Sequence, residues 1–254
     1  MKTRKQCVFC GSATTKISNE HAWPNWIRPL LAPTVSTIVG TRPANKPITY
    51  PGRRDDMGVK ANAVCQPCNE GWMGRLENEV RSFLTSMIRN GAETVLSREQ
   101  QFSLARWVLK TAMVFEFTNA ATPFYTFNDR DALRKGLSIG ATVIWIARYE
   151  GSKFLSTAVV KALQYDLAIE GEVSRHPGSG FTLSAGQFAA QVLTIRTPPE
   201  MTGLWLKVPL EFETSVAVLW PRAENDPLAW PPAPSLTDAT LDAFMGRFVE
   251  DQQT

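Results

Sequence analysis

Apolar runs long enough to cross a membrane are absent from this sequence, and histidine and cysteine are scarce. No stretch of the 254 residues approaches the roughly 18 consecutive apolar positions that a membrane-spanning helix needs. The basic residues 1–6 lead into a cysteine and not into the apolar stretch of a secretory signal. We therefore expect a cytoplasmic protein with no membrane partner. Hydrophobic residues make up 44% of the chain, which is enough for a sizeable core.

All four cysteines occur in two C-x-x-C pairs, Cys7 with Cys10 and Cys65 with Cys68. This spacing lets two thiolates from one tight turn reach the same ion, and two such pairs complete a tetrahedral four-sulfur zinc site. Disulfides, free core cysteines and a redox motif are the alternatives. A cytoplasmic chain disfavours disulfides, and redox C-x-x-C motifs occur singly near a βαβ pattern, which is absent here. We predict one structural zinc ion.

Charge is unevenly distributed along the chain. Residues 1–90 contain 13 lysine and arginine residues against 6 aspartate and glutamate residues, a net charge of +7. Residues 91–254 contain 14 against 18, a net charge of −4. A basic half is typical of proteins that bind polyanions, because lysine and arginine displace counterions from phosphates. Charge alone leaves nucleic-acid binding and a merely basic surface equally open.

Apolar periodicity predicts helices first and strands later. Spacings of three and four predict a helix after Cys68 that ends at Asn90 and Gly91. Ser97 and Gln100 form a capping box before a second, largely apolar helix over 98–117. Shorter helices are expected over 129–135 and 237–249, and a long loop or ribbon over 32–57. Runs rich in β-branched and aromatic residues predict strands over 142–149, 161–169, 187–195, 204–208 and 214–220.

A histidine and several oxygen ligands lie close to the cysteine pairs in the sequence. A neutral imidazole can take a proton from water near neutral pH, because an unperturbed histidine titrates at about 6.5, and this makes His21 a candidate base. Glu20 precedes it and Asn69 follows Cys68, and their oxygens suit Mg²⁺ or Mn²⁺ better than zinc. The alternatives are an ordinary histidine and a helix N-cap at Asn69. The other histidine, His176, lies in a turn-like sequence and is assigned no role.

The order of these residues resembles the HNH, or ββα-metal, endonucleases, and among them the zinc-containing recombination endonuclease VII group. The shared pattern is Cys-x-x-Cys, an acidic residue followed by histidine, and Cys-x-x-Cys-Asn, and it covers roughly residues 5–85. The resemblance implies that His21 is the general base and that Glu20 and Asn69 hold one catalytic Mg²⁺ or Mn²⁺. It also implies that the four cysteines are structural.

Two positions depart from the family pattern. The middle asparagine of the pattern orients the base histidine, and Asn62 is the nearest candidate for its place. The endonuclease VII group also carries an acidic residue one turn after its final asparagine, where this chain has Trp72. Glu70 and Glu77 are the candidates to supply that carboxylate.

We therefore expect an α+β protein in two parts. Residues 1–90 would form a zinc-stapled, HNH-like ββα-metal module. Residues 91–254 would form an α+β domain, with helices packed on an antiparallel sheet, that regulates the module, binds substrate or forms a homo-oligomer. The leading function is a metal-dependent endonuclease acting on DNA, with defence or mobile-element biology suggested by family analogy alone. The alternative is a catalytically degenerate zinc module that binds nucleic acid or a protein partner.

Overall fold

The computed structural model describes residues 5–18, 20–31, 37–42, 53–54, 58–118, 122–169, 172–197, 210–221 and 226–246. In chain order the elements are β1 (Glu20–His21), η1 (Arg28–Leu30), β2 (Thr37–Arg42), β3 (Arg53–Arg54), β4 (Lys60–Ala61), α1 (Gln66–Cys68), η2 (Asn69–Met73), α2 (Gly74–Asn90), β5 (Thr94–Leu96), α3 (Arg98–Phe115), α4 (Phe127–Arg134), β6 (Thr142–Arg148), β7 (Ser156–Ile169), β8 (Glu172–Ala185), β9 (Phe188–Ile195), η3 (Leu210–Phe212), β10 (Ala217–Trp220), β11 (Leu228–Trp230) and α5 (Asp238–Gly246).

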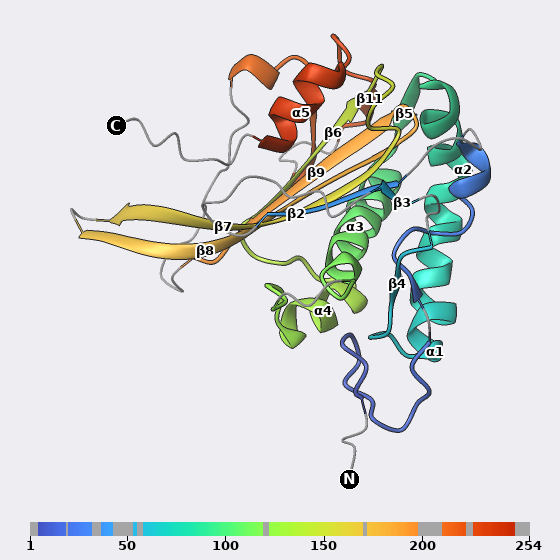
Figure 1. The fold of residues 1–254 in the computed structure, drawn as a ribbon, viewed down its shortest axis with the longest axis vertical. Coiled ribbons are helices and arrows are strands. Elements are labelled where there is room, and N and C mark those ends of the chain that lie inside the picture. The colour runs from blue at the N-terminus through green and yellow to red at the C-terminus, as the bar shows by residue number, and fades with distance from the viewer. Residues whose placement is uncertain are drawn as a thin grey trace.

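A seven-stranded sheet in the order β10-β6-β9-β8-β7-β2-β3 forms the centre of the molecule (Figure 1). Its neighbouring strands are antiparallel except β2 and β7, which are parallel. A parallel pair needs a long connection, and more than one hundred residues separate these two strands. The α+β class is confirmed, but strands β2 and β3 from the expected loop or ribbon extend the sheet of the second half.

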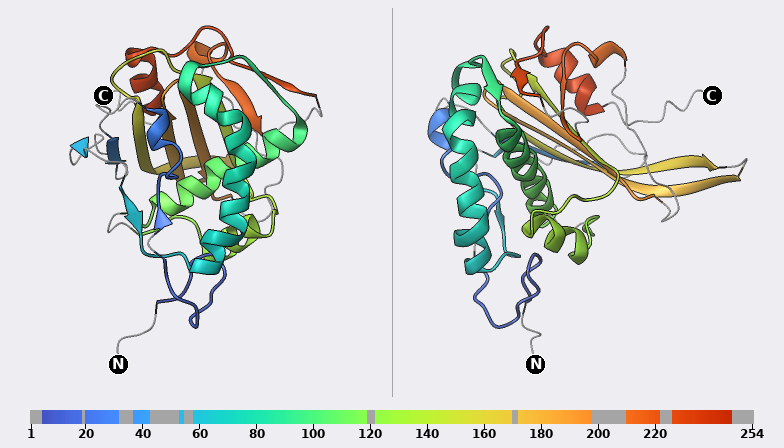
Figure 2. Two further views of the ribbon diagram at one scale, coloured as in Figure 1. Left: turned by 90° about the vertical axis from the view of Figure 1, so that its right-hand side faces the viewer. Right: turned by 180° about the vertical axis from the view of Figure 1, so that it is seen from behind.

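Helices cover both faces of this sheet, with α2 and α3 on one side and α5 on the other (Figure 2). The alternating side chains of β6 fill both cores. Ile144 and Ile146 belong to the larger core, which includes α3, whereas Val143 and Trp145 belong to the smaller core under α5. The larger core also contains residues of β4 and α2, so residues on both sides of position 90 pack together. The division of the chain at residue 90 stays a proposal.

Local signals set the bounds of the two long helices. The Ser97 side chain accepts a hydrogen bond from Gln100 N at 3.3 Å, and Ser97 N donates to Gln100 Oε1 at 2.9 Å, which confirms the capping box. Helix α2 ends at Gly91, whose φ of 58° is left-handed and favours glycine. Of the helices in the described ranges, none has the length and apolarity needed to cross a membrane.

Strand β8 runs through the sequence that we expected to be a turn. Pro177 lies within β8 opposite Gln164 of β7, while pairing with β9 begins only at Gly178. At Pro177, strand β8 is paired only with β7. Proline is tolerated at such a position because the N–H that it lacks is not needed for a ladder of hydrogen bonds to a second strand. From the pair Gln164–Pro177 to the pair Ile169–Glu172, β7 and β8 form a two-stranded arm that projects from the sheet (Figure 1). The strand expected over 204–208 and the end of the helix expected over 237–249 lie outside the described residues.

Candidate functional site

The four cysteine thiols form one cluster. Their Sγ atoms all lie within 4.8 Å of one another, and the Sγ atoms of Cys10 and Cys65 are 3.6 Å apart. Four sulfurs at the usual zinc–sulfur distance of about 2.3 Å would stand about 3.8 Å from one another. All four cysteines are free of disulfides. The cluster therefore has the donor set and the spacing of a structural zinc site.

Backbone hydrogen bonds hold the two cysteine pairs against each other. Val8 N donates to Ala63 O at 3.0 Å, and Cys65 N donates to Cys7 Sγ at 3.3 Å. The hydrogen bond between Cys7 and Cys68 lowers the pKa of Cys7 to about 4 and raises the pKa of Cys68. One thiol of the cluster therefore gives up its proton readily, as zinc binding requires.

Glu20, His21, Asn69 and Glu77 line a single pocket of about 260 Å³. Strand β1 supplies the first two, and it pairs antiparallel with β4 so that Glu20 lies opposite Ala61 and His21 opposite Lys60. The π-helical turn η2 supplies Asn69, and α2 supplies Glu77 eight residues later, about two helical turns on. Pro24, Asn25 and Trp26 complete the lining. Residues far apart in the sequence thus meet in one place.

Asn69 is not the N-cap of a helix. It follows α1 with a helical φ of −60°, inside a helical segment that began at Gln66, so the N-cap interpretation is wrong. Asn69 Nδ2 donates to Ser18 Oγ at 3.3 Å, and Ser18 Oγ donates to Val64 O at 2.9 Å. This chain fixes the amide plane, and Asn69 Oδ1, the better ligand for a hard cation, then points away from Ser18.

A lysine that sequence reasoning missed stands behind the pocket. Lys110 of α3 is completely buried, and its Nζ lies 2.8 Å from Oε1 of Glu77. Glu20 is only 5% exposed, and burial raises its pKa to about 7; Lys110 opposes this rise and Glu77 adds to it. A lysine within the largely apolar sequence of α3 was the available signal, because a buried charge needs a partner.

The remaining candidates lie elsewhere. Asn62 is exposed in the turn after β4, and Glu70 is exposed and accepts a hydrogen bond from Gln66 Nε2 at 2.7 Å. Neither lines the pocket, whereas Glu77 does. Trp72 packs edge-to-face on Phe9 with ring centroids 5.5 Å apart, so it connects η2 to the first cysteine pair.

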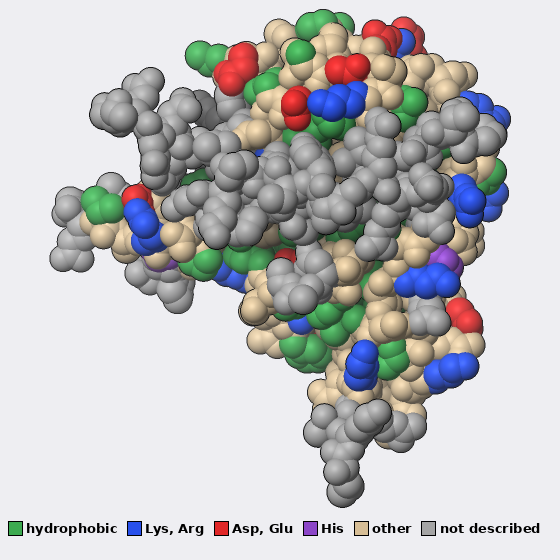
Figure 3. All heavy atoms as spheres, in the orientation of Figure 1, with side chains coloured by type: hydrophobic (Ala, Val, Ile, Leu, Met, Phe, Trp, Pro, Cys, Tyr) green, Lys and Arg blue, Asp and Glu red, His purple; other side chains and the backbone are tan. Residues whose placement is uncertain are grey.

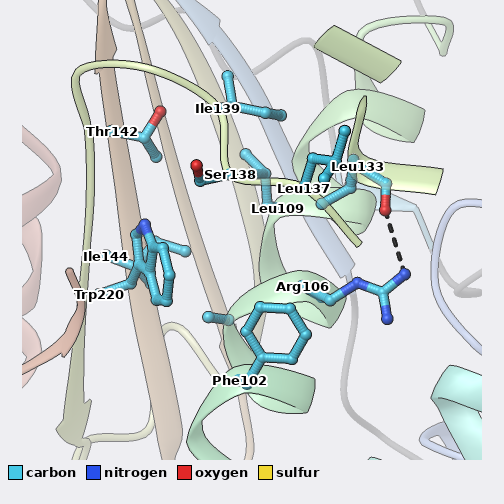
Figure 4. A pocket seen from close by; sticks show the side chains of 11 residues that line it. Phe102, Arg106, Leu109, Leu133, Leu137, Ser138, Ile139, Thr142, Ile144 and Trp220 are labelled. Atoms are coloured by element: carbon cyan, nitrogen blue, oxygen red, sulfur yellow. Dashed lines mark hydrogen bonds between the residues drawn. The ribbon is translucent and has the colours of Figure 1, made fainter. Parts of the chain in front are cut away.

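A second pocket lies between α3, α4 and strands β6 and β10 (Figure 4). Its lining is mostly apolar, and Arg106 Nη2 donates to Leu133 O at 3.1 Å. Its volume of about 30 Å³ has room for only one or two water molecules.

Two exposed basic side chains come from segments next to residues that line the first pocket. Arg28 of η1 and Lys60 of β4 are exposed, and Lys60 is the cross-strand neighbour of His21. Lysine and arginine side chains recur along the side of the molecule that carries η1 and β4 (Figure 3). This distribution suits an anionic ligand at the pocket.

Comparisons with known proteins do not identify the ligand or the reaction of this pocket. An imidazole, two carboxylates, an amide and a buried ammonium group meet in or against this pocket, beside a cluster of four thiols. No protein-family model, no curated protein and no solved structure matches this chain.

Proposed function

We propose that this protein is a metal-dependent endonuclease that hydrolyses phosphodiester bonds in DNA. The observation that carries the proposal is the meeting of Glu20, His21 and Asn69 in one pocket beside the four-cysteine cluster. The antiparallel pair β1 and β4 and the later helix α2 support the proposal, because two antiparallel strands and a helix make up the ββα-metal module of the HNH endonucleases that the sequence resembles. On this proposal residues 1–90 form the catalytic module.

Each pocket residue has a role in this proposal. His21 is half-buried and takes the proton from the water that attacks the phosphorus. Glu20 and Asn69 hold one Mg²⁺ or Mn²⁺, and Ser18 keeps the Asn69 amide in place. A bound cation of this kind would neutralise the charge that develops on the phosphate and the leaving 3′ oxygen.

The donor set fits a hard cation. Carboxylate and amide oxygens are the ligands that Mg²⁺ and Mn²⁺ prefer. Glu20 and Glu77 share a single buried counter-charge in Lys110, which leaves one excess negative charge when both are ionised. Binding a divalent cation would remove this excess and favour ionisation of Glu20.

Charge and thiol chemistry support the choice of partner and location. Residues 1–90 carry a net charge of +7, and Lys60, the cross-strand neighbour of His21, is exposed, which suits the phosphates of a DNA backbone. A cytoplasmic location, where thiols stay reduced, accords with four free cysteines. Residues 91–254 would regulate the module, bind substrate or form a homo-oligomer.

The test is cleavage of supercoiled plasmid by the full chain in EDTA, Mg²⁺ or Mn²⁺. We expect nicking or linearisation that needs the divalent ion and falls about 100-fold or more in His21→Ala, because a general base contributes at least that much. His176→Ala is the matched control, because His176 is half-buried like His21 but lies in β8 opposite Tyr165, and this variant should cleave normally. DNA binding without cleavage under any ion would favour the degenerate zinc module instead.

A further inference from the structure

Lys110 lies at a buried position, where a charged side chain costs free energy of folding. Its side chain has no solvent exposure, and it comes from α3, outside the residues that resemble HNH endonucleases. Removing an ammonium group from water costs several kcal/mol unless a partner offsets it. A leucine or methionine would fill the same space in the core without that cost. The presence of a charge at this position therefore points to a role for Lys110 in the neighbouring pocket.

The partner of Lys110 is a pocket residue. Lys110 Nζ donates to Oε1 of Glu77 at 2.8 Å, and Glu77 lines the same pocket as Glu20, His21 and Asn69. The bond fixes one carboxylate oxygen of Glu77 and holds the side chain against α3. Lys110 also acts electrostatically on Glu20, in the direction that favours its ionised form. One ammonium group thus bonds to one carboxylate of the pocket and acts electrostatically on the other.

The charges of these groups determine what the pocket can accept. When both are ionised, the two carboxylates and one ammonium group leave a single net negative charge, which attracts a divalent cation. With the cation bound, one net positive charge remains, which matches the single negative charge of a phosphodiester. Without Lys110, the loaded pocket would be neutral and would hold the cation more tightly but the phosphate more weakly.

We infer that Lys110 is a positioning residue of the pocket: it fixes Glu77 and cancels one carboxylate charge, so that the cation-loaded pocket keeps a positive charge for the phosphodiester. This inference rests on the proposed metal-dependent function. It adds that a residue of α3, beyond position 90, belongs to the nuclease site.

Mn²⁺ binding to the zinc-loaded full chain tests this role without any need for cleavage, because the electron paramagnetic resonance signal reports free Mn²⁺. Lys110→Met should bind Mn²⁺ about fivefold or more tightly than the wild type, and Glu77→Gln about fivefold or more weakly. The double variant restores the original pocket charge and should bind within about twofold of the wild type. In cleavage assays with saturating Mn²⁺, Lys110→Met should raise KM for DNA.

A purely structural lysine predicts a different pattern. Lys110→Met that keeps its zinc and its unfolding midpoint but binds Mn²⁺ no more tightly than the wild type would overturn the inference. If Lys110→Met fails to fold, the double variant must bind Mn²⁺ more tightly than Glu77→Gln, and equal or weaker binding is again a refutation. Failure of the wild type to bind Mn²⁺ would overturn the proposed function and this inference together. If the wild type binds Mn²⁺ and cleaves DNA but the variants bind Mn²⁺ with unchanged affinity, only the role of Lys110 is overturned.

Discussion

Arg130 of α4 donates a hydrogen bond from Nε to the carbonyl oxygen of Val8, inside the first cysteine pair, at a distance of 2.9 Å. Val8 lies between Cys7 and Cys10, so this bond connects the second half of the chain to the four-cysteine cluster. Arg130 also donates to Tyr125 O and is only 8% exposed. The same side chain faces the buried carboxylate of Glu116, whose pKa burial raises to about 7.

Arg130→Met should destabilise the protein and loosen its zinc. The substitution leaves the Val8 and Tyr125 carbonyls without this donor and removes a cation near Glu116, so we expect a loss of about 2–4 kcal/mol in the free energy of unfolding. Urea unfolding and the rate of zinc release to a chromogenic chelator measure both effects. Arg134→Met is the control, because Arg134 is one-third exposed and its ion pair with Asp131 should contribute less than about 1 kcal/mol. Equal losses in the two variants would contradict the role given to Arg130.

Native mass spectrometry should find one zinc ion per chain, and Cys68→Ser should lose it. The thiolates supply the zinc–sulfur bonds, and the cluster links the first residues of the chain to the start of the α1 helix. We expect the variant and the chelator-treated wild type to melt at a lower temperature by similar amounts. Ser12→Ala, a change beside the cluster that removes no thiol, should retain its zinc. A chain that carries a disulfide in place of zinc would refute the prediction.

Stability should depend on pH through Glu20. Burial raises its pKa from the usual 4.5 to about 7, so the folded protein binds a proton more strongly than the unfolded chain. The free energy of unfolding therefore falls as the pH rises from 4.5 to 7, by about 1–3 kcal/mol for this one group. In the absence of Mg²⁺ and Mn²⁺, Glu20→Gln should flatten this slope.

Denaturant unfolding at pH 5 and pH 8 measures the effect. Glu116 has a pKa raised in the same way, so the slope should be reduced and not abolished in Glu20→Gln. An unchanged slope in Glu20→Gln would show that Glu20 is not protonated in the folded protein at pH 5.

DNA affinity should depend on Lys60 and Arg28. Both are exposed; Lys60 lies opposite His21, and Arg28 follows the pocket residue Trp26 by two positions. Replacing either by alanine should reduce the slope of log affinity against log salt by about 1, because one cation no longer neutralises a phosphate. Fluorescence anisotropy with labelled duplex DNA, in a His21→Ala background that prevents cleavage, gives this slope. Lys153→Ala is the control, because Lys153 pairs with Asp242 of α5 on the opposite face of the sheet. A slope that changes equally in all three variants would indicate unspecific attraction to a basic protein.

Sequence reasoning succeeds where the deciding interactions are local. The capping box of Ser97 and Gln100 and the left-handed Gly91 determine helix ends within a few residues of themselves. The spacing within each C-x-x-C pair is equally local; the meeting of the two pairs is long-range, but the tetrahedral preference of zinc for four thiolates predicted it. The two helix ends and the cysteine cluster therefore agree with the prediction from the sequence.

The features that the sequence did not predict depend on contacts between residues far apart in the chain. Lys110 pairs with Glu77, 33 residues away, and no periodicity in α3 reveals which surface a buried lysine meets. The parallel pairing of β2 with β7 is longer in range still, and Pro177 sits in a strand only because β9 begins pairing one residue later. Tertiary neighbours decided each of these cases.

The parallel pairing of β2 with β7 also determines the order in which the protein can assemble during its synthesis. Residue 42 of β2 leaves the ribosome long before its partner, residue 161 of β7, and at 5–20 residues per second the delay is roughly 6–24 s. During this interval β1 and β4 are already translated, but the segment between them has no sheet edge to join. A nascent chain therefore carries its zinc cysteines and His21 well before it can complete the fold around them.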